Sequence, residues 1–340
     1  METLIEVRKL TKHYGVGRGL LAGLKGNAPV VRAVDGIDFT LGRGESIGLL
    51  GESGCGKTTT GRLLLKLTEP SSGDITYDGK PLAKINRAEQ KQFRRKAQLI
   101  FQNPFDALNP RFTLLRCLTE PLINAGIPRQ EHRAYVERAL DIARFAAGRD
   151  LLDRHPHQLS GGQLQRVVIA RALILSPEFV VADEPVSMLD VSVRAGILNL
   201  LREVSRELSL SAVYISHDLS LVRYLCSRTI VMYLGAIVED GPTDAIIREP
   251  LHPYTRALVA AVPTPDPHQS RAPLPIGATA PDARLKTHGC RFADRCPAVM
   301  ARCRDEAPEL RAVESGRSVA CHLYGQGNAR GDAGVMALAS

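Results

Sequence analysis

The chain has 340 residues, of which 44% are hydrophobic and 24% are charged, and this ordinary globular composition excludes global disorder. No apolar run reaches the length of a membrane span, and the N-terminal METLIEVRKL lacks the apolar core of a signal peptide, so we expect a chain kept in a reducing compartment. The net charge of +8 at pH 7 is compatible with nucleic acid, an anionic membrane surface or a phosphate-rich ligand and does not decide among them.

The first chemical motif along the chain is a phosphate-binding loop. An apolar run at residues 47–50 predicts a buried strand, GESGCGKT follows at 51–58, and a leucine-rich pattern at 63–67 predicts a helix. In this context, backbone N–H groups and the helix dipole bind phosphates, a lysine contacts the β- and γ-phosphates, and a hydroxyl ligates Mg²⁺. The chain is therefore predicted to bind a nucleoside triphosphate. The residues expected at its phosphates are Gly51, Ser53, Gly54, Cys55, Gly56, Lys57, Thr58 and Thr59.

A long segment with helical periodicity follows. Sequences such as RAEQKQFRRKAQ and EHRAYVERALDIARFA place polar residues on one helical face. We expect a mostly helical subdomain over about 86–160.

Two further segments complement the phosphate loop. The sequence LSGGQ at 159–163 precedes a helical pattern, so Ser160 is placed as an N-cap beside two glycines with exposed donors. An apolar run at 179–182 predicts a strand that ends in Asp183 and Glu184. A carboxylate at such a strand tip commonly holds Mg²⁺, and its neighbour is placed to orient or deprotonate the attacking water. A second anion site that cannot close on the same nucleotide suggests two chains meeting head to tail.

Taken together and in this order, these motifs resemble the ATP-binding cassette (ABC) proteins over residues 1 to about 250. The resemblance implies an α/β P-loop NTPase with a RecA-like core, an antiparallel β subdomain and an α-helical subdomain. It matches Gln102 in LIFQNP to the Q-loop glutamine, Asp190 in SMLD to the D-loop, His217 after AVYIS to the switch histidine, and Tyr14 to the aromatic residue that stacks on adenine. Met188 departs from the family, which usually has a small residue there, but it removes no donor or carboxylate.

The resemblance also implies a mechanism. Two cassettes would enclose two ATP molecules, each between the phosphate loop of one chain and the LSGGQ of the other. The contacts from LSGGQ would come from Ser160, Gly161, Gly162 and Gln163. Catalysis would use Lys57, Gln102, Glu184 and His217, with Glu184 polarising the lytic water and His217 contacting the γ-phosphate. Mg²⁺ would be served, directly or through water, by Thr58, Gln102 and Asp183.

The composition changes after residue 250. A proline-rich stretch predicts that residues 251–288, which begin with an HPYT segment, are an extended linker, followed by a cysteine-rich extension at 289–324 and a disordered tail at 325–340. The extension contains Cys290, Cys296, Cys303 and Cys321 but little apolar material, so we expect a bound metal to stabilise its fold. Four thiolates suit an iron–sulfur cluster or zinc, and the absence of C-x₂-C pairs disfavours zinc. HPYT with GCRFADRCP resembles the C-terminal extension of dipeptide and oligopeptide importer ATPases, some of which carry a [4Fe–4S] cluster.

The resemblance thus implies the ATPase subunit of a bacterial peptide importer, peripheral at the cytoplasmic face of the inner membrane. Its partners would be a second ATPase subunit in a heterodimer, two permease subunits and a periplasmic or surface solute-binding protein, without nucleic acid. Three alternatives stay open: an importer of nickel, glutathione or another small solute, a cassette ATPase that acts on ribosomes or nucleic acid, and a sensor whose cluster reports redox or iron status.

Overall fold

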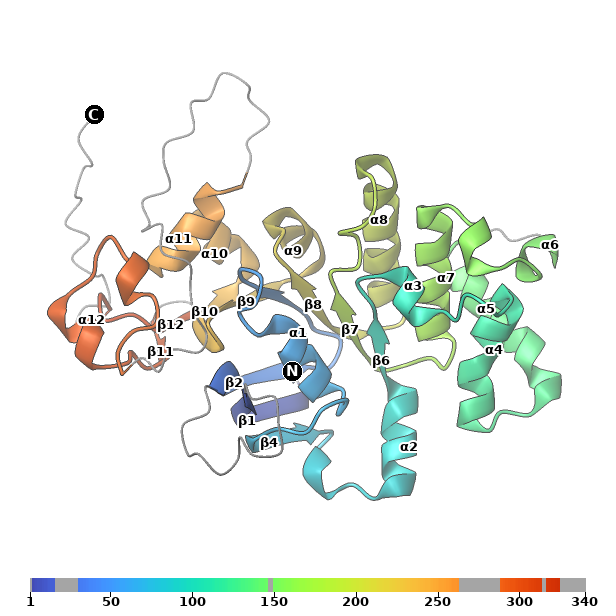
Figure 1. Cartoon of the computed structure of the whole chain (residues 1–340), viewed down its shortest axis with the longest axis horizontal. Coiled ribbons are helices and arrows are strands. Elements are labelled where there is room, and N and C mark those ends of the chain that lie inside the picture. Colours follow the sequence, from blue (N-terminus) through green and yellow to red (C-terminus); the bar gives the residue numbers. More distant parts are fainter. Residues whose placement is uncertain (1, 16–29, 146–148, 263–287, 314–315, 325–340) are drawn as a thin grey trace.

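The computed structural model describes residues 2–15, 30–145, 149–262, 288–313 and 316–324, arranged around two sheets (Figure 1). The smaller sheet is antiparallel, in the order β2-β1-β4-β5. Its strands are β1 (Thr3–Gly15), β2 (Val30–Gly42), β4 (Ser72–Tyr77) and β5 (Lys80–Pro81). Within the described residues, no helix combines the length and the apolar character needed to cross a bilayer.

The larger sheet has eight strands in the order β11-β12-β10-β9-β3-β8-β7-β6, and its strands from β9 to β6 are parallel. Its strands are β3 (Ser46–Leu50), β6 (Ala97–Ile100), β7 (Phe179–Asp183), β8 (Ser211–Ser216), β9 (Arg228–Tyr233), β10 (Ala236–Pro242), β11 (Arg311–Ala312) and β12 (Ser318–Val319). The helices are α1 (Lys57–Leu64), α2 (Arg87–Lys96), α3 (Pro104–Ala107), α4 (Leu114–Ala125), α5 (His132–Ile142), α6 (Arg149–Leu152), α7 (Gly161–Leu173), α8 (Val191–Glu207), α9 (Leu219–Leu225), α10 (Thr243–Arg248), α11 (Pro253–Ala260) and α12 (Ala301–Asp305).

The parallel strands are buried on both faces. In β7, Val180 and Ala182 belong to a buried cluster that includes residues of α7, α8 and α9, whereas Phe179 and Val181 belong to a second cluster with α1 and the antiparallel sheet. Strands that are covered on both sides need apolar residues at every position. This explains why their sequences are continuous apolar runs. Because β3, β8 and β7 pair in parallel, their carboxyl ends lie at one edge of the sheet.

The segment predicted to be helical contains a strand of the core. Residues 97–100 form β6 at the edge of the large sheet, where they pair in parallel with β7. Only after β6 does the chain enter the helical layer, in which α4, α5 and α7 contact one another. Four residues between polar helical stretches carry too little periodicity to reveal a strand, so the prediction of a mostly helical segment over about 86–160 did not include β6.

The cysteine-bearing extension continues the large sheet, and Figure 1 shows it beside α11 and β10, away from α4 and α5. β12 pairs with β10, where Val319 lies opposite Glu239. The extension was expected to contain little apolar material to fold around, but it shares the core of the large sheet. Phe292 is only 1% exposed and packs in the cluster that holds Tyr233 and Tyr254. The expected extended linker begins instead with a helix, α11, while residues 263–287 and the predicted disordered tail lie outside the described residues.

A buried ion pair fastens this junction. Arg317 donates to Glu239 at 3.0 Å, and the two side chains are 9% and 0% exposed. The carboxylate of Glu239 also accepts the backbone N–H groups of Leu251 (3.0 Å) and His252 (2.9 Å). One carboxylate on β10 therefore holds both the extension and the approach to α11.

Candidate ATP site

The phosphate loop connects β3 to α1, as its sequence predicts. Gly56 precedes α1 with a φ of 106°, and a Cβ there would lie 2.0 Å from the carbonyl oxygen of Ala33. Gly51 has a φ of 155°, and its Cβ would lie 2.3 Å from the carbonyl oxygen of Met232. No side chain fits at either position, so glycine is required for the turn. The first N–H groups of α1 have no partner within the helix and form a ready anion site.

Lys57 lies against its own loop. Its ammonium donates to the carbonyl oxygens of Gly51 at 2.6 Å and Glu52 at 2.9 Å, and the residue is 6% exposed. These carbonyls satisfy the buried charge when no phosphate is bound. Binding of a triphosphate therefore requires the ammonium to exchange loop carbonyls for phosphate oxygens.

Two predicted magnesium ligands meet at the sheet edge. The hydroxyl of Thr58 donates to the carboxylate of Asp183 at 3.3 Å. Burial raises the pKa of Asp183, and the neighbouring charge of Glu184 raises it further, while the bond from Thr58 opposes both effects. A cavity of about 130 Å³ beside this pair is lined by Thr58, Asp183 and Gln102. These oxygen donors are the type that Mg²⁺ prefers, and a divalent cation would relieve the raised pKa of Asp183.

Two predicted catalytic residues converge on the carboxylate of a third, Glu184. Glu184 accepts a hydrogen bond from the Gln102 amide at 2.9 Å and contacts Nδ1 of His217 at 2.8 Å. Its backbone φ of 44° lies in the left-handed region, where non-glycine residues are strained. Strain of this kind commonly accompanies functional sites. A second cavity of about 90 Å³ is lined by Glu184 and His217, so a small molecule can reach the carboxylate.

The LSGGQ segment forms the start of α7. Ser160 caps the helix, because its hydroxyl accepts from the N–H of Gln163 at 3.3 Å and the Gln163 side chain accepts from the N–H of Ser160 at 3.0 Å. Gly162 allows close packing on α8, since a Cβ there would lie 2.5 Å from Val193. Ser160 and Gly161 are exposed, and none of the LSGGQ residues lines the two cavities beside Asp183 and Glu184. The predicted second anion surface therefore lies outside the two cavities beside Asp183 and Glu184.

Asp190 caps the neighbouring helix α8. Its carboxylate accepts from the N–H of Val193 at 2.9 Å, and this bond, followed by that from Ser192, lowers its pKa. The apolar side chains beside it are exposed, to 64% at Met188 and 81% at Val191. This surface is apolar where a lone chain would favour polar residues.

Tyr14 lies at the end of β1 and is 41% exposed. The ammonium of Lys12 is 5.1 Å from the centre of its ring. The ring is therefore accessible for the stacking on adenine that the family resemblance implies.

Sequence reasoning missed a set of contacts on the phosphate loop from the C-terminal part of the chain. The hydroxyl of Tyr254 accepts the N–H of Glu52 at 2.8 Å, and Arg295 donates to both carboxylate oxygens of Glu52 at 2.9 and 3.0 Å. Tyr254 lies in the HPYT segment and Arg295 precedes Cys296, so both belong to motifs that the sequence did indicate. Nothing in their spacing identified the loop as their target.

The four cysteines of the extension have free thiols. Burial, together with the nearby thiols of Cys290, Cys296 and Cys303, raises the pKa of Cys321 to about 12. The four sulfurs therefore lie in one neighbourhood, and a bound cation would relieve their mutual repulsion. Within the described ranges, however, no group of three or more histidine, cysteine or acidic side chains is arranged so that it could hold a metal ion.

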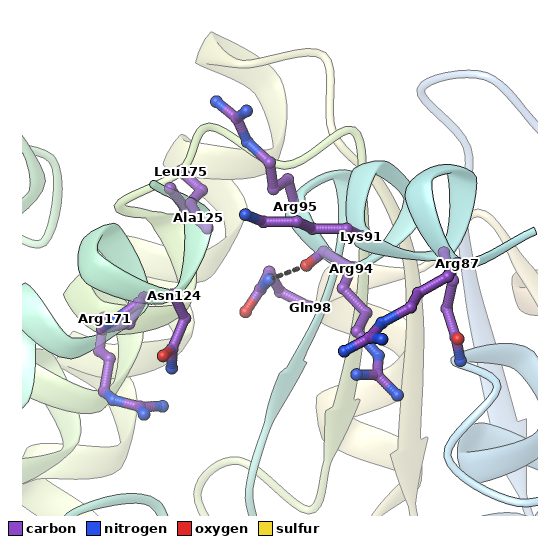
Figure 2. A pocket seen from close by; sticks show the side chains of 11 residues that line it. Arg87, Lys91, Arg94, Arg95, Gln98, Asn124, Ala125, Arg171 and Leu175 are labelled. Atoms are coloured by element: carbon purple, nitrogen blue, oxygen red, sulfur yellow. Dashed lines mark hydrogen bonds between the residues drawn. The ribbon is translucent and has the colours of Figure 1, made fainter. Parts of the chain in front are cut away.

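A basic hollow of about 500 Å³ lies elsewhere, between α2, α4 and α7 (Figure 2). The side chains of α2 stand on one side of it, and Arg171 stands on the other with Asn124. Arg171 donates to Glu120 at 3.1 Å. No predicted nucleotide residue lines the hollow. Four cations of α2 line the hollow: Arg87, Lys91, Arg94 and Arg95. None of the four forms an ion pair within the described part of the chain.

A phosphate loop, paired carboxylates on the adjacent strand and LSGGQ at a helix start define an ATPase of the ATP-binding cassette class. Comparison with known proteins agrees. The family model "ABC transporter" matches residues 34–187, and the model "Oligopeptide/dipeptide transporter, C-terminal region" matches residues 238–303. Among solved structures, the dimeric ATP-binding cassette MJ0796 with ADP and Pi has a TM-score of 0.61 and 27% identity, over 71% of this chain and 99% of that one.

Two curated relatives place the chain more closely. It is 44% identical to a probable peptide ABC transporter ATP-binding protein, y4tS, of Sinorhizobium fredii, over 95% of this chain and 90% of the relative. It is 42% identical to the di/tripeptide transport ATP-binding protein DppF of Pseudomonas aeruginosa, over 95% of this chain and 98% of the relative. The chain belongs to the ABC transporter family, among the ATP-binding proteins of oligopeptide and dipeptide transport.

Proposed function

We propose that this chain hydrolyses ATP to power peptide import across the bacterial inner membrane. The relatives y4tS and DppF are named for peptide and di/tripeptide transport, and the family model matched at residues 238–303 is that of such transporters. The observation that carries hydrolysis is the convergence of Gln102 and His217 on Glu184, next to the Thr58–Asp183 pair. A carboxylate beside a phosphate loop, held by two partners, is suited to orient an attacking water.

In the proposed reaction, the N–H groups at the start of α1 and the ammonium of Lys57 hold the β- and γ-phosphates. Thr58, Asp183 and Gln102 would hold Mg²⁺, directly or through water, and the ion would supply charge neutralisation. Glu184 orients the water and accepts its proton. His217 holds the carboxylate of Glu184 in place and would contact the γ-phosphate. Positioning and electrostatic stabilisation provide most of the acceleration of phosphoryl transfer, so these residues act mainly by pre-organisation.

We further propose that two cassettes form the complete site. The exposed Ser160 and Gly161 of LSGGQ, together with the exposed Met188 and Val191, offer a surface that a partner cassette would cover. The related MJ0796 cassette was solved as a dimer. A different ATPase subunit, giving a heterodimer, is the proposed partner. Sedimentation of the chain with Mg-ATP, alone and with candidate partner ATPases, tests this, and a stable homodimer alone would refute the heterodimer.

The proposed cofactor of the extension is a [4Fe–4S] cluster on Cys290, Cys296, Cys303 and Cys321, with zinc as the alternative. Its support is the common neighbourhood of the four thiols, because burial raises the pKa values of Cys290, Cys296 and Cys321 and a bound cation would lower them. Anaerobic purification followed by metal analysis and absorption spectroscopy distinguishes iron with sulfide from zinc. Protein that is folded and free of both metals would refute the cluster.

The remaining proposed partners are two permease subunits and a solute-binding protein, with this chain peripheral at the cytoplasmic face. The basic hollow near α2 suits a position close to anionic lipid. Co-expression with the permease tests the assignment, because ATPase activity in proteoliposomes should rise with peptide-loaded binding protein. Stimulation by nickel or glutathione instead would favour the alternative importers. Co-sedimentation with ribosomes would overturn the transporter, and ATPase activity that responded only to oxidation of the cluster would favour the sensor.

A further inference from the structure

Glu52, in the phosphate loop, is held at three points. Arg295 donates to both oxygens of its carboxylate, at 2.9 and 3.0 Å, which is the two-pronged geometry that fixes orientation as well as distance. Its N–H donates to the hydroxyl of Tyr254 at 2.8 Å, and its carbonyl accepts from Lys57 at 2.9 Å. Two of these three partners lie in the part of the chain beyond residue 250.

Arg295 is not a loose surface residue. Its side chain is 11% exposed, and its guanidinium also donates to the hydroxyl of Tyr233 at 3.3 Å. The guanidinium carbon lies 5.7 Å from the ring centre of Tyr233 and 5.8 Å from that of Phe292. Phe292 in turn packs against Tyr254, with ring centres 5.6 Å apart. A guanidinium held by aromatic rings loses little freedom when it binds a carboxylate, unlike an exposed ion pair.

A second arginine reaches the other end of the loop. Arg291 donates to the carbonyl of Leu234 and, at 2.6 Å, to the carboxylate of Asp35. Gly235, which follows Leu234 in the chain, donates its N–H to the carbonyl of Cys55 in the phosphate loop at 2.9 Å. Residues 290–296 thus contact the start of the loop directly and its end through one turn.

We propose that residues 290–296 brace the phosphate loop and that Arg295 and Arg291 are positioning residues for ATP binding. This inference rests on the proposed nucleotide site. The loop binds phosphate only when its N–H groups converge. If the loop adopts other conformations part of the time, the apparent affinity for ATP is the intrinsic affinity multiplied by the fraction of molecules in the converged conformation. The brace removes this freedom before ATP arrives, and ATP affinity therefore depends on the docked extension.

The test is the affinity of the full chain for Mg-ATP, measured by equilibrium dialysis. Arg295→Gln removes both hydrogen bonds to the Glu52 carboxylate. We expect the dissociation constant for ATP to rise about tenfold, which corresponds to a loop that adopts the binding conformation in about a tenth of the molecules. Glu52→Gln attacks the same contact from the loop side and should have a similar effect. The double variant should bind no more weakly than the weaker single variant, because the two share one interaction.

Arg304→Gln is the matched control. Arg304 lies in the same extension and pairs with Asp294 at 3.2 Å, but its side chain is 60% exposed and this pair does not include the loop. Its loss should leave the dissociation constant for ATP unchanged.

Hydrogen exchange separates positioning from general destabilisation. In Arg295→Gln, amides of residues 51–58 should exchange faster while those of α8 keep their wild-type rates. Should the variant instead lose the fold of the extension, Glu52→Gln, which leaves the extension intact, decides the matter. Wild-type ATP affinity in both variants, or fully additive losses in the double variant, would overturn the brace. ATP binding that survived Lys57→Ala would instead count against the proposed nucleotide site itself.

Discussion

The sharpest prediction concerns Glu184→Gln. The carboxylate of Glu184 contacts Gln102 at 2.9 Å and His217 at 2.8 Å, so a glutamine of the same size keeps one acceptor oxygen for one of these partners. It cannot accept a proton from water. Loss of a general base costs about 10²- to 10⁴-fold in rate, and we expect turnover to fall within that range.

ATP binding should survive this substitution. The groups expected to hold the phosphates are Lys57, Thr58 and the N–H groups of α1, and of these the structure records only Thr58 as bonded to the strand tip, at Asp183. The dissociation constant for Mg-ATP should therefore stay within about threefold of the wild-type value, equivalent to ~0.7 kcal/mol. Phosphate release by the complex with permease measures turnover, and equilibrium dialysis measures binding.

Glu178→Gln provides a matched control. Glu178 is a half-exposed glutamate before β7, where it pairs with Lys96 at 2.8 Å, and its replacement should leave turnover unchanged. If Glu184→Gln retained more than about a tenth of the wild-type rate, the loss would be smaller than the smallest expected for removal of a general base. The assignment of Glu184 as the base would then be wrong.

Three further predictions follow from the caps, the buried ion pair and a buried histidine. Ser160→Asp preserves the cap of α7 but places a negative charge beside the triphosphate held by the partner cassette. Transporter turnover should therefore fall about 100-fold, while the isolated chain binds ATP normally. Ser160→Asn, which also caps the helix but adds no charge, is the control. Arg317→Met leaves Glu239 buried without its partner and should lower the free energy of unfolding by about 3–5 kcal/mol in denaturant titrations, part of which Glu239→Gln should restore. Burial lowers the pKa of His252 from 6.5 to about 3, so the unfolded chain takes up a proton that the folded chain does not. The free energy of unfolding should then fall by about 2 kcal/mol from pH 7 to pH 5, and His252→Asn, which keeps an acceptor for the N–H of Tyr254, should abolish this part of the slope.

The local motifs were predictable because their physics is local. The phosphate loop depends on consecutive backbone groups and on glycines that no side chain could replace, so Gly51 to Thr58 suffice to indicate it. Strands buried on both faces, such as β3 and β7, are continuous apolar runs and were predicted with nearly correct bounds. β6 escaped because a four-residue strand between two helices has no readable period.

The convergence on Glu184 depended on the order of the strands. Gln102 and His217 are 82 and 33 residues from Glu184 in the sequence. Each follows one of the neighbouring parallel strands β6, β7 and β8, whose carboxyl ends share one edge. Periodicity identifies strands but not their neighbours, so only the family resemblance could suggest that these residues meet.

By itself, then, the sequence determined the nucleotide chemistry, since phosphate recognition is written in short runs of adjacent residues. Tertiary structure alone decided how the C-terminal part is used. Its short strands complete the large sheet through β10, and Arg295 reaches Glu52 across 243 positions of sequence. Contacts of this kind arise from burying Phe292 and its aromatic neighbours in the shared core, and a buried surface carries no spacing signal that would reveal its partner.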